Sequence, residues 1–137
     1  MYRTIEHTAD VGLEVQTSNL SKAFNEISQG FTEIVTGGNL PDKNEIRKIN
    51  IESSELDRLL VRYISQLIYL FDTENFLVSL SELKIRKKLI YTLSGNLSGD
   101  IFDEVKHGYG VEVKAVSYHM LEVQEGPPSK IRVILDL

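Results

Sequence analysis

The sequence predicts an α+β domain of two layers, in which two main helices pack on a mixed or antiparallel sheet. Two segments repeat their apolar residues with helical spacing, and five others alternate apolar and polar residues as strands do. Two helices cannot cover both faces of so many strands, so helices on one face of the sheet are expected. The length of 137 residues, without a linker or an internal repeat, predicts a single domain over residues 1–137.

The first predicted helix covers residues 19–35. Asn19 is suited to cap its first turn, and the Gly37–Gly38 pair is suited to end it. Gly30 within the segment weakens the helix by about 1 kcal/mol relative to alanine, which a long apolar stripe can offset. That stripe consists of Leu20, Ala23, Phe24, Ile27, Phe31, Ile34 and Val35.

The second predicted helix covers residues 53–75 and has the broader apolar face. Ser54 followed by Asp57 three residues later resembles a capping box, and the acid also suits the first turn electrostatically. The apolar face consists of Leu56, Leu59, Leu60, Tyr63, Ile64, Leu67 and Phe71.

Strand-like alternation occupies most of the remaining chain. Two extended stretches precede the first helix, one strand lies between the helices, and a run of strands ends in a hairpin whose last strand closes the chain. The alternating segments are residues 12–17, 46–53, 82–95, 110–124 and 129–137. Turns are predicted at residues 94–100, 106–110 and 125–129, where Gly, Pro, Ser and Asn gather.

Composition limits the classes of function. The chain is 42% hydrophobic and 26% charged, and no apolar run is long enough for a membrane span. It has no cysteine, which excludes disulfides and thiol chemistry, and a cytoplasmic location is expected. The net charge of −5 argues against a protein whose main task is to hold nucleic acid, so direct nucleic-acid binding is expected to be weak or absent. The basic run Lys84–Lys88 is interpreted as the solvent face of a strand.

Two acidic residues are the leading candidates for a site. Asp10 lies where the first two extended stretches meet, and Asp136 is the single acid of an apolar terminal strand. Strand ends are places where carboxylates and backbone carbonyls can hold a hard cation. The plainer interpretations are turn chemistry for Asp10 and a solvated chain end for Asp136.

No motif of a known catalytic machinery accompanies these acids. HExxH, GxSxG, Walker A and GxGxxG patterns are all missing from the sequence. His7 and Thr8 stand beside Asp10, and His119 alternates with apolar neighbours as a histidine within a sheet does. Lys114 lies two residues from Glu112, which suggests a surface ion pair.

Taken together, five ordered segments resemble the archease family over nearly the full length. They are "YRTIEHTADVGLEV" with its central His-Thr-Ala-Asp, "LSKAFNEISQGFTEIVT", "ELDRLLVRYISQLIYLFDTENFLV", "VEVKAVSYHMLEV" and the closing "VILDL".

The resemblance implies an SHS2-type fold and a role as an accessory protein. Archeases promote the guanylylation and turnover of a GTP-dependent RNA ligase that joins tRNA exon halves and repairs RNA, with the help of a bound divalent cation, commonly calcium. By position, Asp10 and Asp136 match two of the family's acidic metal ligands. Gly37 stands where the family usually has a further acid, and Asp42 is the nearest acid that could replace it.

The same resemblance gives the neighbouring residues possible roles. His7 and Thr8 would support the metal site, and Lys114 would contact the ligase, with His119 as a further residue of the site or the partner surface. Two other functions stay open: a chaperone-like modulator of other RNA-processing enzymes, and a metal-assisted hydrolase in which Asp10 and Asp136 hold a cation that activates water.

Overall fold

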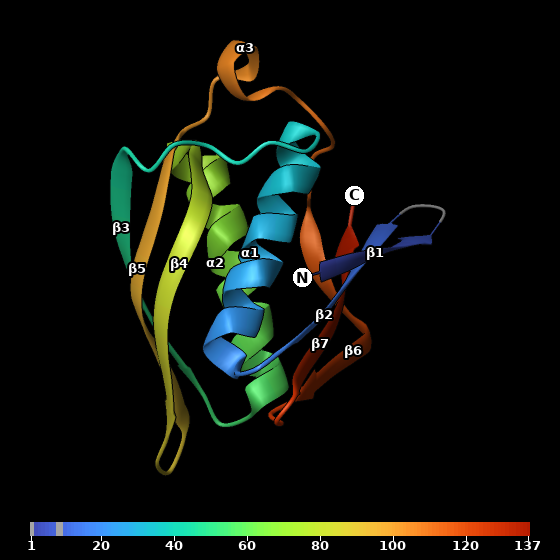
Figure 1. Cartoon of the computed structure of the whole chain (residues 1–137), viewed down its shortest axis with the longest axis vertical. Coiled ribbons are helices and arrows are strands. Elements are labelled where there is room, and N and C mark those ends of the chain that lie inside the picture. Colours follow the sequence, from blue (N-terminus) through green and yellow to red (C-terminus); the bar gives the residue numbers. More distant parts are fainter. Residues whose placement is uncertain (1, 8–9) are drawn as a thin grey trace.

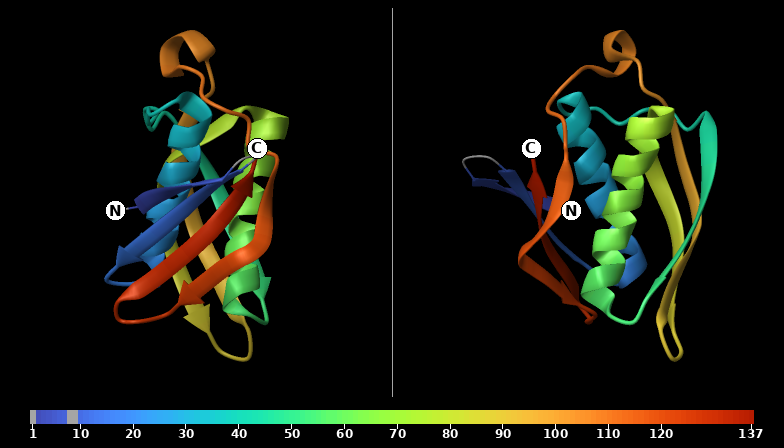
Figure 2. Two further views of the ribbon diagram at one scale, coloured as in Figure 1. Left: turned by 90° about the vertical axis from the view of Figure 1, so that its right-hand side faces the viewer. Right: turned by 180° about the vertical axis from the view of Figure 1, so that it is seen from behind.

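The computed structural model describes residues 2–7 and 10–137, with only the backbone described for residues 5–7. Two antiparallel sheets enclose two long helices, so the helices form the middle layer (Figure 1). The view from behind shows the same order of layers, and the view from the side shows the four-stranded sheet in front of the helices (Figure 2). The predicted α+β class, the antiparallel pairing and the two main helices are confirmed. The strands divide between two sheets, which differs from the two-layer expectation.

The first sheet has four strands in the order β1-β2-β7-β6. Its strands are β1 (Tyr2–His7), β2 (Asp10–Thr17), β7 (Ser129–Asp136) and β6 (Ala115–Gln124). The second sheet has three strands in the order β3-β5-β4. They are β3 (Glu45–Ser53), β5 (Tyr91–Ile101) and β4 (Phe76–Lys87).

The long helices are α1 (Leu20–Thr36) and α2 (Leu56–Glu74). Each helix buries residues on more than one face, because each packs on both sheets. Val61 and Ile68, outside the predicted apolar face of α2, are therefore also buried. A hydrophobic cluster runs through both sheets and both helices and includes the contacting rings of Phe24 and Tyr63. None of the described helices is long and apolar enough to cross a membrane.

The ends of α1 confirm the sequence prediction, whereas the start of α2 corrects it. Asn19 caps α1 by accepting a hydrogen bond from Lys22 N, and Gly37 ends it with a left-handed backbone at φ 84°. The N-cap of α2 is Glu55, without a side-chain bond, so the predicted capping box at Ser54 is wrong. Asp57 does lie in the first turn, where its carboxylate accepts from Arg58 N at 2.7 Å.

The segment predicted as one strand over residues 82–95 is a hairpin of β4 and β5. Its turn is closed by Lys88 N donating to Ile90 O at 3.1 Å and carries no glycine or proline, so no turn residue in the sequence indicates it. The turn predicted at residues 94–100 lies inside β5. A Cβ atom on Gly95 or Gly99 would clash with the β4 backbone, so these glycines permit close approach of two strands.

The predicted strand over residues 110–124 begins later, at Ala115. Before it, a short helix α3 (Glu104–His107) and an extended segment cross the end of α1. Gly110 N donates to Val35 O and Val111 N to Ile34 O, so this segment bonds carbonyls of the last helical turn. The bonds to α1 replace the sheet partners that a strand would need.

Polar side chains of α1 cover the open edge of β4. Thr32 Oγ1 donates to the Val78 carbonyl at 2.6 Å, and both groups are buried. Two neighbours on the same helix face act likewise: Gln29 Nε2 donates to Ser79 O at 3.0 Å, and Asn25 Oδ1 accepts from Ser81 N at 2.8 Å. An edge strand with unpaired backbone groups invites association with other chains, and this helix face prevents it along that part of β4.

Replacing Thr32 with valine tests the edge cover. Thr32→Val keeps the side-chain shape but leaves the buried Val78 carbonyl without its donor, so we expect a loss of about 1–3 kcal/mol in the free energy of unfolding. Urea unfolding followed by circular dichroism measures it. Thr73→Val is the matched control, because the Thr73 hydroxyl is exposed and should change stability by less than about 0.5 kcal/mol. Equal effects of the two variants would contradict the interpretation.

Candidate functional site

The pairing of β2 with β7 brings the two leading acids together. The strands run antiparallel with Asp10 opposite Asp136 and Thr17 opposite Ser129. Directly opposite residues in such a pair have Cβ atoms about 4.5–5.5 Å apart on one face. The two carboxylates, 126 positions apart in the sequence, therefore lie side by side, and both residues are half-buried. The predicted juxtaposition of Asp10 and Asp136 is confirmed as geometry.

The flanking strands extend the same row of the sheet. The backbone of His7 in β1 is opposite Asp10, and Ala115 in β6 is opposite Asp136. Lys114 N donates to the Asp136 carbonyl at 2.8 Å, so the exposed Lys114 stands beside the acid pair. The side chain of His7 and the whole of Thr8 lie outside the described residues.

His119 is not placed in a regular position of the sheet. The pairing of β6 with β7 shifts between Ser117 and Glu122, and His119 lies in this irregular stretch with an exposed side chain. Its backbone N donates to Ser117 Oγ at 3.0 Å. The interpretation of His119 as a residue of a sheet strand is confirmed, because it lies within β6, but its side chain is exposed and the register shift sets it outside the regular ladder.

Gly37 adds no carboxylate to the pair, and its surroundings leave little room for one. A Cβ atom there would lie 3.2 Å from the Tyr109 carbonyl, and the positive φ disfavours any L side chain. Asp42, the acid suggested as a replacement, lies instead near Lys106, with Oδ2 3.8 Å from Nζ. No group of three or more acids or histidines suited to a metal occurs among the described residues.

Glu14 shares a sheet face with Asp10 but is committed to other partners. It stands four residues along β2, about 13 Å away by strand geometry. Arg3 and Arg132 both donate to its carboxylate from the adjacent strands. The hydrogen bond from Arg3, with the help of Arg132, lowers the pKa of Glu14 below its ordinary value. Glu122 extends this row of alternating charge, 3.6 Å from Arg132.

A second polar cluster lies beneath α3, and the sequence did not reveal it. The Asp100 carboxylate accepts from Lys106 Nζ at 3.0 Å, from Ile101 N at 2.9 Å and from Asn44 Nδ2 at 3.3 Å. The Lys106 bond, followed by the Ile101 bond, lowers the pKa of Asp100 from 3.8. The stability that Asp100 contributes is therefore present above about pH 3.8 and is lost as the pH falls through its lower folded-state pKa.

Buried His107 completes this cluster as an anchor for α3. Its Nδ1 accepts from Asp103 N at 3.0 Å, which leaves the proton of the neutral ring on Nε2, 3.7 Å from Asp100 Oδ2. Its carbonyl accepts from Asn39 Nδ2 at 2.8 Å, so the end of α1 and α3 are tied together. The only sequence signal is an acid, Asp103, four residues before His107, which lies in the turn predicted at residues 106–110.

The donor set at Asp10 and Asp136 partly fits a hard cation. Two carboxylates supply at most four oxygen atoms, whereas Ca²⁺ takes six to eight and Mg²⁺ often binds one or two carboxylates plus water or phosphate. Further oxygens from water, backbone or a partner would be needed. The chain thus presents an α+β domain with an acid pair at a sheet end and no obvious catalytic apparatus among the described residues.

Comparison with known proteins identifies the family. The model of the Archease protein family (MTH1598/TM1083) matches residues 2–137. The protein archease of Pyrobaculum neutrophilum is 33% identical over 139 residues, covering 99% of this chain and 95% of that protein. That of Pyrobaculum islandicum is 34% identical over 126 residues, covering 90% and 86%. The chain belongs to the archease family.

Solved structures share the fold. The solution structure of protein 1598 of Methanobacterium thermoautotrophicum superposes with a TM-score of 0.80 at 30% identity, covering 99% of this chain and 98% of that chain. The crystal structure of a Thermotoga maritima protein described as an archease and possible chaperone superposes with a TM-score of 0.61 at 20% identity, covering 100% and 98%. The second likeness concerns the fold alone.

Neutralising one acid of the pair should stabilise the metal-free protein. Like charges directly opposite in a sheet repel, so Asp136→Asn is expected to raise the free energy of unfolding in chelator by about 0.2–1 kcal/mol. Urea unfolding at low salt measures the gain, which should shrink in 1 M salt because the charges are screened.

Asp100→Asn is the matched control for this change. It removes the same charge from a carboxylate that accepts three hydrogen bonds, so it should lower stability instead. If Asp136→Asn also lowered stability in chelator, Asp136 would have a stabilising partner and the account of an unrelieved acid pair would fail.

Proposed function

We propose that this protein is an accessory protein of a GTP-dependent tRNA-splicing or repair RNA ligase, and that Asp10 and Asp136 jointly hold a divalent cation needed for its effect. The observation that carries the proposal is the register of β2 and β7, which sets two carboxylates opposite each other without a basic residue bonded to either in the described part of the chain. Membership of the archease family supports the accessory role.

The chain's own residues suit contact with a partner enzyme. When bound, the cation would supply positive charge that a partner's phosphate or carboxylate oxygens could share. Asp10 and Asp136 would orient it from the sheet end, and the rigid β2–β7 ladder would keep their carboxylates in register. The exposed Lys114 stands beside them and would add a second positive group for the same partner.

The incomplete ligand set itself favours a partner. Gly37 supplies no side chain, and Glu14 is held by two arginines, so the described residues offer the cation few side-chain oxygens. A site of this kind gains affinity when another molecule adds ligands, as substrate phosphates do for Mg²⁺. Cation binding and docking to the ligase would then reinforce each other.

A direct test is stimulation of ligase guanylylation. Ligase, GTP and divalent cation are incubated with this protein, and the covalent ligase–guanylate is quantified over time. Asp10→Ala and Asp136→Ala should each reduce the stimulation roughly tenfold or more, because each removes a ligand. Lys114→Ala should raise the concentration needed for half-maximal stimulation severalfold, since it weakens the encounter.

Asp72→Ala supplies the control, because Asp72 is an exposed acid near the end of α2 and far along the chain from the pair. Circular dichroism checks that every variant is folded. Normal stimulation by both Asp10→Ala and Asp136→Ala would show that the cation mechanism is wrong for this protein.

A chaperone-like function is the second candidate, and exposed apolar side chains favour it. Val105 is 97% exposed, Tyr109 60% and Val111 47%, all on α3 and the segment that follows it. Exposed apolar groups close together are typical of surfaces that bind other proteins. Suppression of client aggregation that persists in Asp136→Ala but is lost in Tyr109→Ser and Val111→Ser would support this function over the first.

A further inference from the structure

The β4–β5 hairpin carries a concentrated positive charge on a negatively charged protein. Lys84, Arg86, Lys87 and Lys88 are all exposed. In the described part of the chain, no carboxylate lies within ion-pair distance of these four side chains, and Lys87 Nζ lies 4.9 Å from the centre of the Tyr91 ring. The hairpin projects beyond the helices at the end opposite α3 (Figures 1 and 2).

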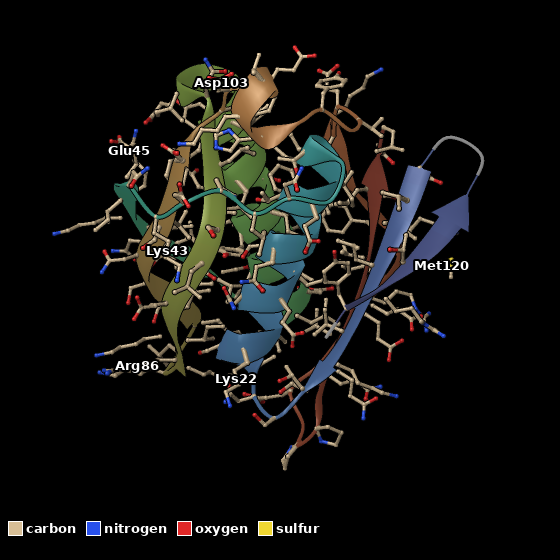
Figure 3. The ribbon with its side chains drawn as sticks, turned by 45° about the horizontal axis from the view of Figure 1, so that its top comes forward. Lys22, Lys43, Glu45, Arg86, Asp103 and Met120 are labelled. Atoms are coloured by element: carbon tan, nitrogen blue, oxygen red, sulfur yellow. The ribbon has the colours of Figure 1, made fainter. Side chains whose placement is uncertain are left out.

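Two shallow grooves flank this basic hairpin. One, of about 390 Å³, runs between Arg86 and Lys87, the start of α1 and the β6–β7 connection. The other, of about 620 Å³, runs between β4, β5 and α1 and is lined by both Lys22 and Lys84. Lys22 and Arg86 lie at the same end of the molecule, away from Asp103 (Figure 3). We call the five cations Lys22, Lys84, Arg86, Lys87 and Lys88 the basic end.

The grooves are also lined by hydroxyl and amide side chains, by two acids and by apolar residues. The hydroxyls and amides are Ser18, Asn19, Ser21, Asn25, Ser81, Ser94 and Asn96, the acids are Glu82 and Glu125, and the apolar residues include Leu20, Ile85, Tyr91 and Pro127. Lysine and arginine combined with small hydroxyl and amide side chains are the groups that proteins use to contact the phosphates and sugars of nucleic acids.

The net charge of −5 hides this arrangement, because it averages over the chain. With the basic end set apart, the remaining surface is more negative still and would repel a polyanion. A nucleic acid would therefore touch the protein only at this end, over a few phosphates, with low affinity and strong dependence on salt.

We propose that the basic end binds the phosphate backbone of RNA. The choice of RNA among polyanions rests on the proposed function, in which the ligase works on RNA. The basic end and the acid pair lie in different parts of the fold, since β4 and β5 belong to one sheet and β2 and β7 to the other. The protein could then contact the ligase through one part and the RNA substrate through the other.

Fluorescence anisotropy of a labelled 20-nucleotide single-stranded RNA with the full chain tests the proposal, without ligase. Wild type should bind at 50 mM salt, and the logarithm of affinity should fall linearly with the logarithm of salt concentration. The triple variant Arg86→Glu, Lys87→Glu, Lys88→Glu should bind at least tenfold more weakly. Its salt slope should be smaller by about 2, since each lost phosphate contact on a single strand removes about 0.7.

The control changes net charge equally at three exposed lysines elsewhere: Lys43→Glu, Lys48→Glu, Lys130→Glu. It should weaken binding by no more than about threefold, because its lysines act only through long-range charge. Equal losses in the two triple variants, or no binding by wild type at 50 mM salt, would overturn the proposal. So would binding of wild type to phosphatidylserine vesicles but not to RNA.

Because the assay contains no ligase, its result is independent of the proposed function. RNA binding that follows the basic end, together with a failure to stimulate guanylylation, would refute the accessory role and leave the RNA site standing. Stimulation of guanylylation with no RNA binding would refute the RNA site and leave the accessory role standing.

Discussion

The antiparallel ladder between β2 and β7 is the contact on which the rest of the structure depends. It joins the second strand of the chain to the last one, through eight paired positions. The inward side chains of both strands are buried in the core, including Leu13, Val133 and Leu135, each with no measurable exposure. The same ladder fixes the outward row, so the register that fills the core also sets Asp10 beside Asp136. A slip of one strand by one residue would turn its acid to the opposite face from the other acid and would expose its core residues.

The middle layer explains why a chain of this size supports two sheets. Each helix is apolar on more than one side and so fills the space between the sheets. The remaining face of α1 is polar. Its side chains Thr32, Gln29 and Asn25 form hydrogen bonds with the backbone at the edge of β4. One helix thereby does two tasks, packing the core and closing a strand edge. The acid pair is left at the opposite sheet, where none of the described side chains donates a hydrogen bond to either carboxylate.

Local patterns in the sequence predicted much of this fold, and long-range pairing accounts for most of the rest. Apolar spacing placed both helices, and Asn19 and Gly37 were correctly interpreted as helix ends because capping depends on neighbouring residues alone. Gly95 and Gly99 were misread as turn residues, since their purpose is to let β4 approach β5 and nothing local shows that. The division into two sheets depends equally on pairings between distant strands.

The candidate site, like the fold, could be predicted from the sequence only in part. Asp10 and Asp136 were expected together through family resemblance, and the structure places them opposite each other. The cluster of Asp100, Lys106 and His107 escaped notice because it forms only when α3 folds back over the end of β5. The commitment of Glu14 to two arginines on other strands was equally invisible, although it decides which acids remain for a cation.

The most direct test of the account is calcium titration by calorimetry on chelator-treated protein, comparing wild type with Asp136→Asn and with the exposed-acid control Asp72→Asn. If Asp10 and Asp136 hold a shared cation, wild type and Asp72→Asn bind calcium saturably, and Asp136→Asn loses that binding. Equal binding by wild type and Asp136→Asn, or no binding by wild type, would contradict the claim that Asp10 and Asp136 hold a shared cation.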